Sequence, residues 1–380
     1  MSRYIINPFF IYIFIFLVVL IFYPLKWSYL QPDLTLNLIS FVVTTFLIGL
    51  IFLIIFSKIE IVKKIEKTDN KFVWFMFLFG SFLEFLYQGA IPFFEIMTGK
   101  DFKYNLFGIP TFHVFFLPYV SAVGVFSLYK FLINKEKQRL YIYIFSLLYC
   151  LLIFNRGAIL FILISSVFLY IQIYGFFNLK KIILSILIMP LILYIFGYMG
   201  NYRMASSGYS SDEIILTVGR ATPNFLNSKI PNEFLWSYLY LVTPYANLQY
   251  QLDSTSSNVN YIEVFKTQIL LDAIQKRIYV DENFSNNLIT DEFNVSTMYG
   301  KPVQVSGIFG AYVLFFYFII VIFILTLLSP KRYRIVILSI LCSVTVFTAF
   351  TNTLVFSGFI LQPILIILLC KMRFNKISLI

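Results

Sequence analysis

Three arginines lie close to the ends of apolar segments, and their side chains are suited to binding phosphate oxygens. Arg156 joins two apolar segments, Arg203 follows an apolar segment that ends near residue 198, and Arg220 lies farther into a polar stretch. A guanidinium group can donate two parallel hydrogen bonds to a phosphate. We therefore expect these cations to bind a diphosphate. The alternative is that Arg203 and Arg220 pair with nearby acids and that Arg156 anchors its hairpin at an interface.

Arg156 lies at the tip of a short hairpin formed by residues 140–154 and 158–174. A helix rises about 1.5 Å per residue, so the first segment is shorter than the apolar core of a bilayer, which is about 30 Å thick. We expect the tip to carry Arg156 below the outer surface, where a guanidinium group needs an anionic partner. Glu84, towards the outer end of segment 72–88, is a candidate for that partner or for a proton acceptor. The alternative is a carboxylate that reaches interfacial water.

The other side chains with potential chemistry are the single histidine and a group of aromatic residues. His113 opens an apolar segment, and we predict a structural role because no orienting partner for an imidazole base is evident. Trp236, Tyr238, Tyr240 and Tyr245 suit either contact with a sugar or a belt at the membrane interface. The belt is the favoured interpretation.

The composition indicates that membrane-spanning helices position these residues. Hydrophobic residues make up 60% of the 380-residue chain and charged residues only 12%, with a mean hydropathy of +0.85. The three cysteines all lie in apolar segments, which indicates no disulfide framework. We predict an all-α, polytopic integral membrane protein with about ten transmembrane helices. The predicted spans are residues 8–23, 34–57, 72–88, 112–133, 140–154, 158–174, 182–198, 307–328, 335–351 and 354–370.

The distribution of Lys and Arg over the short loops predicts the orientation. The short loops fall into two alternating sets, one on each side of the membrane. The set on the side away from the termini holds only Lys26, Lys100, Lys103 and Arg156. The two termini and alternate loops hold 18 basic residues, namely Arg3, Lys58, Lys63, Lys64, Lys67, Lys71, Lys130, Lys135, Lys137, Arg139, Lys180, Lys181, Lys331, Arg332, Arg334, Lys371, Arg373 and Lys376. This bias predicts that both termini are cytoplasmic. The net charge of +11 then reflects topology and contact with membrane lipids, with no indication of nucleic acid binding.

A polar stretch over residues 199–306 separates predicted helices 1–7 (residues 1–198) from helices 8–10 with a cytoplasmic tail (residues 307–380). We expect this stretch to form a large extracytoplasmic loop of short helices that covers a cavity. Its cations Lys266, Lys276 and Arg277 are predicted to pair with acids on a solvated face. The loop contains no His or Cys, and its adjacent acids fit a helix start and solvated turns, so we predict no metal and no other cofactor.

Several short motifs accompany this arrangement of a hairpin followed by a large outer loop. They are Asn155-Arg156-Gly157, Trp236-Ser237-Tyr238, Thr243-Pro244-Tyr245-Ala246-Asn247-Leu248, Ser296-Thr297-Met298-Tyr299-Gly300 and Val305-Ser306-Gly307-Ile308-Phe309-Gly310. Together they resemble the O-antigen or oligosaccharide repeat-unit polymerases of the Wzy type, over residues 140–325. The sequence departs from one pattern of some polymerases, because no outer-face arginine is followed by a glycine eleven residues later.

The resemblance implies a glycosyltransferase of the bacterial inner membrane that polymerises undecaprenyl-diphosphate-linked oligosaccharides into O-antigen or capsular polysaccharide. A chain-length-regulating co-polymerase would be a partner. The reaction requires stabilisation of a departing diphosphate and deprotonation of an acceptor hydroxyl. Arg156, Arg203 and Arg220 are candidates for the first role, and the carboxylates of Glu84, Glu233 and Asp291 for the second, without a basis for choosing among them. Trp236, Tyr238 and Tyr299 are the candidate glycan-binding residues.

Three other classes are weighed against a polymerase. An O-antigen ligase would share the architecture, but that resemblance requires a histidine in the large outer loop, which has none. Another lipid-linked-sugar glycosyltransferase would usually carry acids in its first outer loop, where residues 24–33 offer only Asp33. A flippase or secondary transporter would place its site at the midplane between internal repeats, and no repeat is evident.

Overall fold

The computed structural model describes residues 7–61, 71–98, 106–175, 179–206, 214–255, 260–278, 287–371, 373–374 and 377–378. Within these residues the helices are joined by loops, and the extended structure consists of one short antiparallel pair, β1 (Arg373–Phe374) and β2 (Ile377–Ser378), and an isolated bridge between Ser28 and Ala221. The predicted all-α class is therefore confirmed.

Each apolar segment predicted from the sequence falls on a helix. These helices are α2 (Pro8–Phe22), α3 (Leu36–Ser57), α4 (Lys71–Gln88), α6 (Phe112–Asn134), α7 (Lys137–Leu152), α8 (Arg156–Tyr174), α9 (Leu179–Ser206), α15 (Gly300–Leu328), α16 (Arg334–Phe347) and α17 (Ser357–Lys371). Among the described residues, five are long and apolar enough to cross a membrane: α2 with the turn η1 (Tyr23–Leu25), α3, α6, α8 and α15. The apolar stretches of α4, α9, α16 and α17 are shorter.

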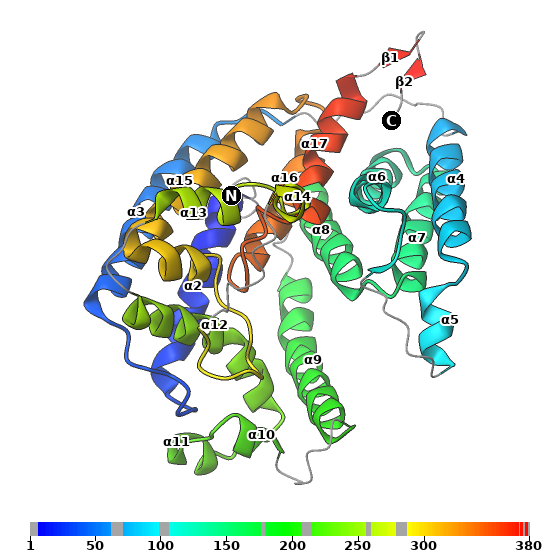
Figure 1. The fold of residues 1–380 in the computed structure, drawn as a ribbon. Helices are drawn as coiled ribbons and strands as arrows, with labels where there is room; N and C mark the ends of the chain where they lie inside the picture. Colours follow the sequence, from blue (N-terminus) through cyan, green and yellow to red (C-terminus); the bar gives the residue numbers. More distant parts are fainter. Residues whose placement is uncertain are drawn as a thin grey trace.

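The other described segments contain one long helix, α12 (Phe234–Ser254), and five short ones. The short helices are α5 (Pro92–Met97), α10 (Ile214–Val218), α11 (Pro223–Leu226), α13 (Tyr261–Gln268) and α14 (Asp272–Ile278). Figure 1 shows α2, α3, α12, α13 and α15 on one side of the molecule and α4 to α7 on the other, with α8, α16 and α17 between them. Helix α6 packs against α7, α8 and α17, and α16 packs against α2 and α8. The α7–α8 hairpin is therefore held by α6 on one side and, through α8, by α16.

Two helices differ from what their sequences indicate. A proline usually ends or kinks a helix, but α12 continues through Pro244 to Ser254. Residues around Pro244 are buried, and the packing outweighs the lost backbone hydrogen bond. The helix predicted to start at residue 307 begins at Gly300 and is kinked at Ser306 and Gly307, where Gly307 has φ of 60°. Glycine adopts this conformation without a side-chain clash.

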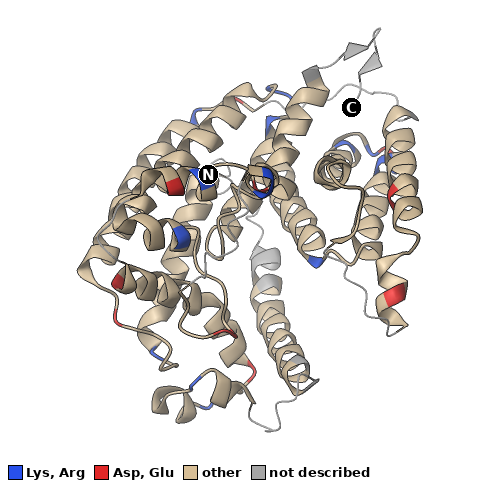
Figure 2. Cartoon of the chain, viewed as in Figure 1, with Lys and Arg blue, Asp and Glu red and all other residues tan. Residues whose placement is uncertain are grey.

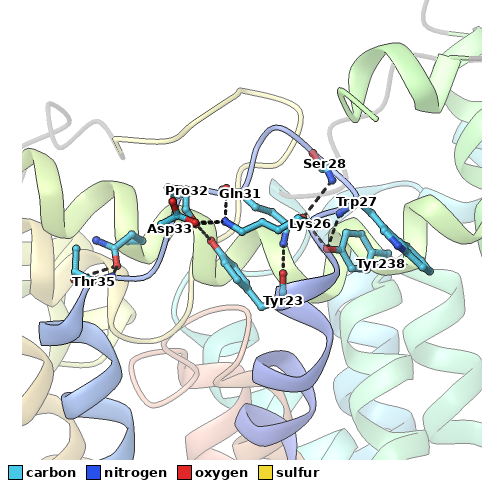
Figure 3. A network of polar contacts seen from close by, with 10 residues as sticks. Tyr23, Lys26, Trp27, Ser28, Gln31, Pro32, Asp33, Thr35 and Tyr238 are labelled. Carbon is cyan, nitrogen blue, oxygen red and sulfur yellow. Dashed lines mark hydrogen bonds and ion pairs between the residues drawn. The ribbon is translucent and has the colours of Figure 1, made fainter. Parts of the chain in front are cut away.

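Polar contacts connect the first loop (residues 24–33) to residues 219–222. Ser28 Oγ donates to the Gly219 carbonyl at 2.5 Å, and Tyr29 N donates to the Arg220 carbonyl at 2.9 Å. Figure 3 shows the adjoining network, in which Gln31 accepts from the Tyr238 hydroxyl at 2.6 Å. The first loop and the segment after α10 therefore lie at the same end of the bundle.

A second set of contacts lies at the other end of α2 and α3, where α3 leads into Glu60. Lys331 Nζ pairs with Glu60 Oε2 at 2.6 Å, and the guanidinium of Arg334 donates to the Glu60 carbonyl at 2.8 Å. Figure 2 shows that charged residues are sparse along the helices and occur mainly at helix ends and in loops. Such a distribution is expected for helices whose central parts lie in apolar surroundings, where a charged side chain is costly.

Candidate functional site

A carboxylate–imidazole pair connects α4 and α6. His113 Nδ1 lies 2.9 Å from Glu84 Oε1 and 3.1 Å from Glu84 Oε2, and the Tyr149 hydroxyl donates to Glu84 Oε2. Glu84 is fully buried, whereas the His113 side chain is 23% exposed. A buried carboxylate requires such partners. The expected alternative for Glu84, a carboxylate that reaches interfacial water, is therefore wrong, and its contacts are to His113 and Tyr149 rather than to Arg156.

The local backbone holds the imidazole ring in place. Gly108 has φ of 103°, and a Cβ at this position would lie 2.5 Å from His113 Cγ. Only glycine fits this close approach at a positive φ. Phe107 contacts the same ring edge to face, with centroids 5.8 Å apart, and His113 N donates to the Ile109 carbonyl at 2.9 Å. The predicted structural role of His113 rested on the lack of an orienting partner, and Glu84 is that partner.

Arg156 lies beside this pair at the tip of the α7–α8 hairpin. Asn155 caps α8 by accepting from Ala158 N at 2.9 Å, so Arg156 is the first residue of the helix. Its guanidinium lies over the Phe154 ring, 4.8 Å from the centroid. Arg156 is exposed rather than carried into the protein at depth. It lines a cavity of about 390 Å³, here called the arginine cavity, together with Phe107, His113, Ile153, Phe154, Asn155 and Gly157.

A second cavity of about 440 Å³, the central cavity, shares His113, Asn155 and Gly157 with the arginine cavity. Residues of α14, including Lys276, and the start of α17 complete its wall. Asp272 at the start of α14 accepts from Ser357 N at 2.9 Å and from Ser357 Oγ at 2.5 Å. These bonds fix α14 beside α17, and Lys276 lines the cavity instead of lying only on a solvated face as predicted.

The arrangement suits transfer of a proton next to a cation. With the Nδ1 proton directed to Glu84, the other ring nitrogen of His113, Nε2, carries the lone pair that can accept a proton. The carboxylate orients the ring and stabilises the imidazolium that forms. Arg156 lines the arginine cavity and Lys276 lines the central cavity, so each of the two cavities that His113 lines has one cation in its wall. Such a site can deprotonate a hydroxyl and stabilise an anionic leaving group.

The other predicted phosphate-binding and basic residues lie apart from these cavities. Arg220 is exposed, has φ of 46° and lies at the first loop. Arg203 belongs to α9, and its side chain lies outside the described part of the chain. Glu233 precedes α12, and its carbonyl accepts from Trp236 N. Asp291 lies in an exposed turn. The described structure brings together only Glu84 and Arg156 from the predicted catalytic and phosphate-binding residues, at the site of His113.

The predicted glycan-binding residues are packed inside the protein. The Trp236 indole N–H donates to Asn201 Oδ1 at 2.6 Å, and the side chain is 1% exposed. The Tyr238 hydroxyl donates to Gln31, and burial raises its pKa. Tyr299 is fully buried, with its hydroxyl 2.7 Å from that of Tyr12. Trp236 and Tyr238 therefore do not form the expected belt at the membrane interface, and none of the three candidate glycan-binding residues lines the cavities described above.

No group of three or more His, Cys, Asp or Glu side chains in the described part of the chain is placed to hold a metal ion. No family model, curated protein or solved structure matches this chain. We therefore infer function from the residues of the site.

Proposed function

We propose that the protein is a membrane glycosyltransferase that polymerises undecaprenyl-diphosphate-linked oligosaccharide units into O-antigen or capsular polysaccharide. The observation that carries the proposal is the shared cavity wall, where the Glu84-bound His113 lies with Arg156. The base and the cation that glycosyl transfer from a diphosphate requires are both present there. The motifs of the hairpin and the outer loop support the same class.

In the proposed reaction, the acceptor hydroxyl transfers its proton to His113 Nε2 as its oxygen bonds to the anomeric carbon of the growing chain. The bond between that carbon and the diphosphate oxygen breaks, and the electron pair leaves with the lipid diphosphate. Arg156 and Lys276 offset the negative charge on the leaving group. Glu84 stabilises the imidazolium, which then releases its proton to water. Thus we propose His113 as the base, with Glu84 as its positioning residue.

We propose that the site faces the outer side of a bacterial inner membrane and that both termini are cytoplasmic. The excess of Lys and Arg at the termini and alternate loops supports this orientation. The contacts between the first loop and residues 219–222, and between Glu60 and residues 331–334, fit two loop sets at opposite ends of the helices. The remaining apolar helices would complete ten spans in this arrangement.

An O-antigen ligase is the second candidate, and the position of His113 favours it over the remaining classes. The large outer loop has no histidine, but α14 from that loop closes the central cavity that His113 lines. His113 of α6 can therefore act as the base in a site that is partly covered by α14 of the large loop. The two candidates differ in the acceptor, which is another lipid-linked repeat unit for a polymerase and a lipid A-core molecule for a ligase.

The test is the product formed by the purified protein in liposomes supplied with undecaprenyl-diphosphate-linked repeat units. We expect a ladder of glycans on the lipid from the wild-type protein and, after the same reaction time, a much shorter ladder from Arg156→Lys, which retains the charge but loses the bidentate fork. No ladder from the wild-type protein, with transfer of the glycan to added lipid A-core instead, would support the ligase. A normal ladder from Arg156→Lys would contradict the proposed site.

A further inference from the structure

A third cavity adjoins the central cavity, with which it shares Asp272 and Phe356. It has a volume of about 190 Å³ and lies among the end of α12, helices α13 and α14, residues 294–298 and the connection between α16 and α17. Its wall is rich in carboxamide and hydroxyl groups, contributed by Gln251, Gln268, Gln275, Asn294, Thr351 and Asn352 among others, and it includes one acid, Asp272, and one cation, Lys301. We call it the amide-lined cavity.

The groups of this wall are held firmly by the protein. Asn352 donates through Nδ2 to the Gln268 carbonyl at 2.9 Å and accepts from Leu354 N at 3.2 Å. Gln275 donates through Nε2 to the carbonyls of Thr267 and Leu270, at 3.0 and 2.6 Å. A rigid set of polar groups loses little conformational entropy when a ligand binds. The cavity is therefore organised before it is occupied.

One group of the wall has an unused hydrogen-bond donor. Gln251 is 1% exposed, and its Oε1 accepts from Ser296 Oγ at 2.9 Å. Its Nε2 is buried and has no hydrogen-bond partner among the described residues. A buried donor without a partner is costly, which indicates that an oxygen atom of a ligand or water belongs beside it.

We propose that the amide-lined cavity binds one neutral, polyhydroxylated sugar ring of the lipid-linked glycan; this inference rests on the proposed glycosyl transfer. Carboxamides both donate and accept hydrogen bonds, as sugar hydroxyls do, and the two charged side chains of the wall, Asp272 and Lys301, have opposite signs and add no net charge. The volume suits one ring rather than a whole repeat unit. The cavity shares Asp272 and Phe356 with the central cavity, so a ring bound there lies next to the place where a glycan reacts at His113. The substrate class is thus a glycan with a neutral sugar next to the residue that reacts.

The probe for this site is a lipid-free sugar, because its binding requires neither the diphosphate nor the reaction. Saturation-transfer NMR on the full chain in lipid nanodiscs compares galactose and N-acetylglucosamine with glucuronate. We expect at least one neutral sugar to bind and glucuronate to bind more weakly. No binding of either neutral sugar, or stronger binding of glucuronate, would overturn the inference.

Variants assign the binding to this cavity. Gln251→Glu keeps an acceptor for Ser296 and removes the donor, and Thr351→Val removes a hydroxyl from the wall with little change in shape. Each substitution should lower the affinity for the neutral sugar about 3- to 10-fold, as expected for the loss of one hydrogen bond. The matched control is Gln172→Met on α8, a carboxamide whose side-chain N and O are also unpartnered among the described residues but do not line the amide-lined cavity. Wild-type affinity in both cavity variants would overturn the assignment.

The sugar site and the transfer reaction can fail separately. Arg156→Lys should keep neutral-sugar binding while the glycan ladder formed in a fixed time becomes much shorter. Sugar binding in the wild-type protein without any ladder would preserve the sugar site and remove the polymerase. A glycan ladder without sugar binding would support the polymerase and overturn the sugar site.

Discussion

The first-loop network and the His113 site use similar polar side chains in different ways. In the network, Gln31 accepts from Ser28 N and the Tyr238 hydroxyl and donates to the Tyr23 carbonyl, so its carboxamide is satisfied within the protein. At the site, Glu84 is satisfied by His113 and Tyr149, but the ring it orients lines two cavities. The comparison shows that bonding capacity left facing a cavity, rather than polarity or aromatic content, distinguishes a candidate site from a structural network.

The largest effect should follow the loss of the proposed base. His113→Ala removes the group that accepts the hydroxyl proton, and general-base catalysis contributes typically about 10²–10⁴-fold. We expect the initial rate of chain extension in liposomes to fall by that order at equal protein level. Tyr238→Phe in the network is the comparison variant and should retain the rate per folded molecule. Equal rates in the wild type and His113→Ala would remove the distinction between the two regions.

A smaller loss should follow Arg156→Lys. The substitution removes one of the two hydrogen bonds that a guanidinium group can donate to the diphosphate. A hydrogen bond to a charged group contributes about 1.5–3 kcal/mol, so the rate should fall roughly 10- to 100-fold if that bond acts mainly on the leaving group. Arg220→Lys is the matched control, because Arg220 is exposed and lies at the first loop. Its rate should stay within about twofold of the wild type, as expected for a surface change worth less than ~0.5 kcal/mol. Comparable losses of rate from both substitutions would show that the position of Arg156 in the cavity wall has no special role in the reaction.

Part of this account could be predicted from the sequence. Long runs of apolar residues predicted the helices, because the backbone groups of a segment in apolar surroundings must form their hydrogen bonds within that segment. Glu84 and His113 were also predicted at the outer ends of consecutive spans, and this signal could have paired them. Their actual contact depends on the packing of α4, α6 and α7, which no local pattern reports. The burial of Trp236 and the passage of α12 through Pro244 likewise depend on tertiary packing.

The network should respond in stability rather than in activity. Gln31→Leu leaves the buried partners of the carboxamide unsatisfied, at a cost of about 1–3 kcal/mol for each group that finds no water. Thermal denaturation in detergent should show a lower melting temperature. The rate of chain extension per folded molecule should stay at the wild-type value. Unchanged stability with lost activity would place the network in the site.

The smallest effect should come from the exposed ion pair beside that network. Lys26 Nζ lies 2.8 Å from Asp33 Oδ1, and this hydrogen bond lowers the pKa of Asp33 from 3.8. Any stability from the pair is therefore present above the unfolded-state pKa and is lost as the pH falls through the lower folded-state value. The Asp33 side chain is 98% exposed, so Asp33→Asn should shift the melting temperature less than Gln31→Leu does, and only above about pH 4. A larger shift than that of Gln31→Leu would reverse this ranking.

The most direct test of the site is a double-mutant cycle between Glu84 and His113, with the initial rate of chain extension as the readout. If Glu84 acts through the imidazole, Glu84→Gln should slow the wild-type protein by about tenfold or more and change the rate of His113→Ala by less than about twofold. The two losses are then strongly non-additive. Fully additive losses, or no loss from either single substitution in protein that folds normally, would contradict a base held in place by Glu84.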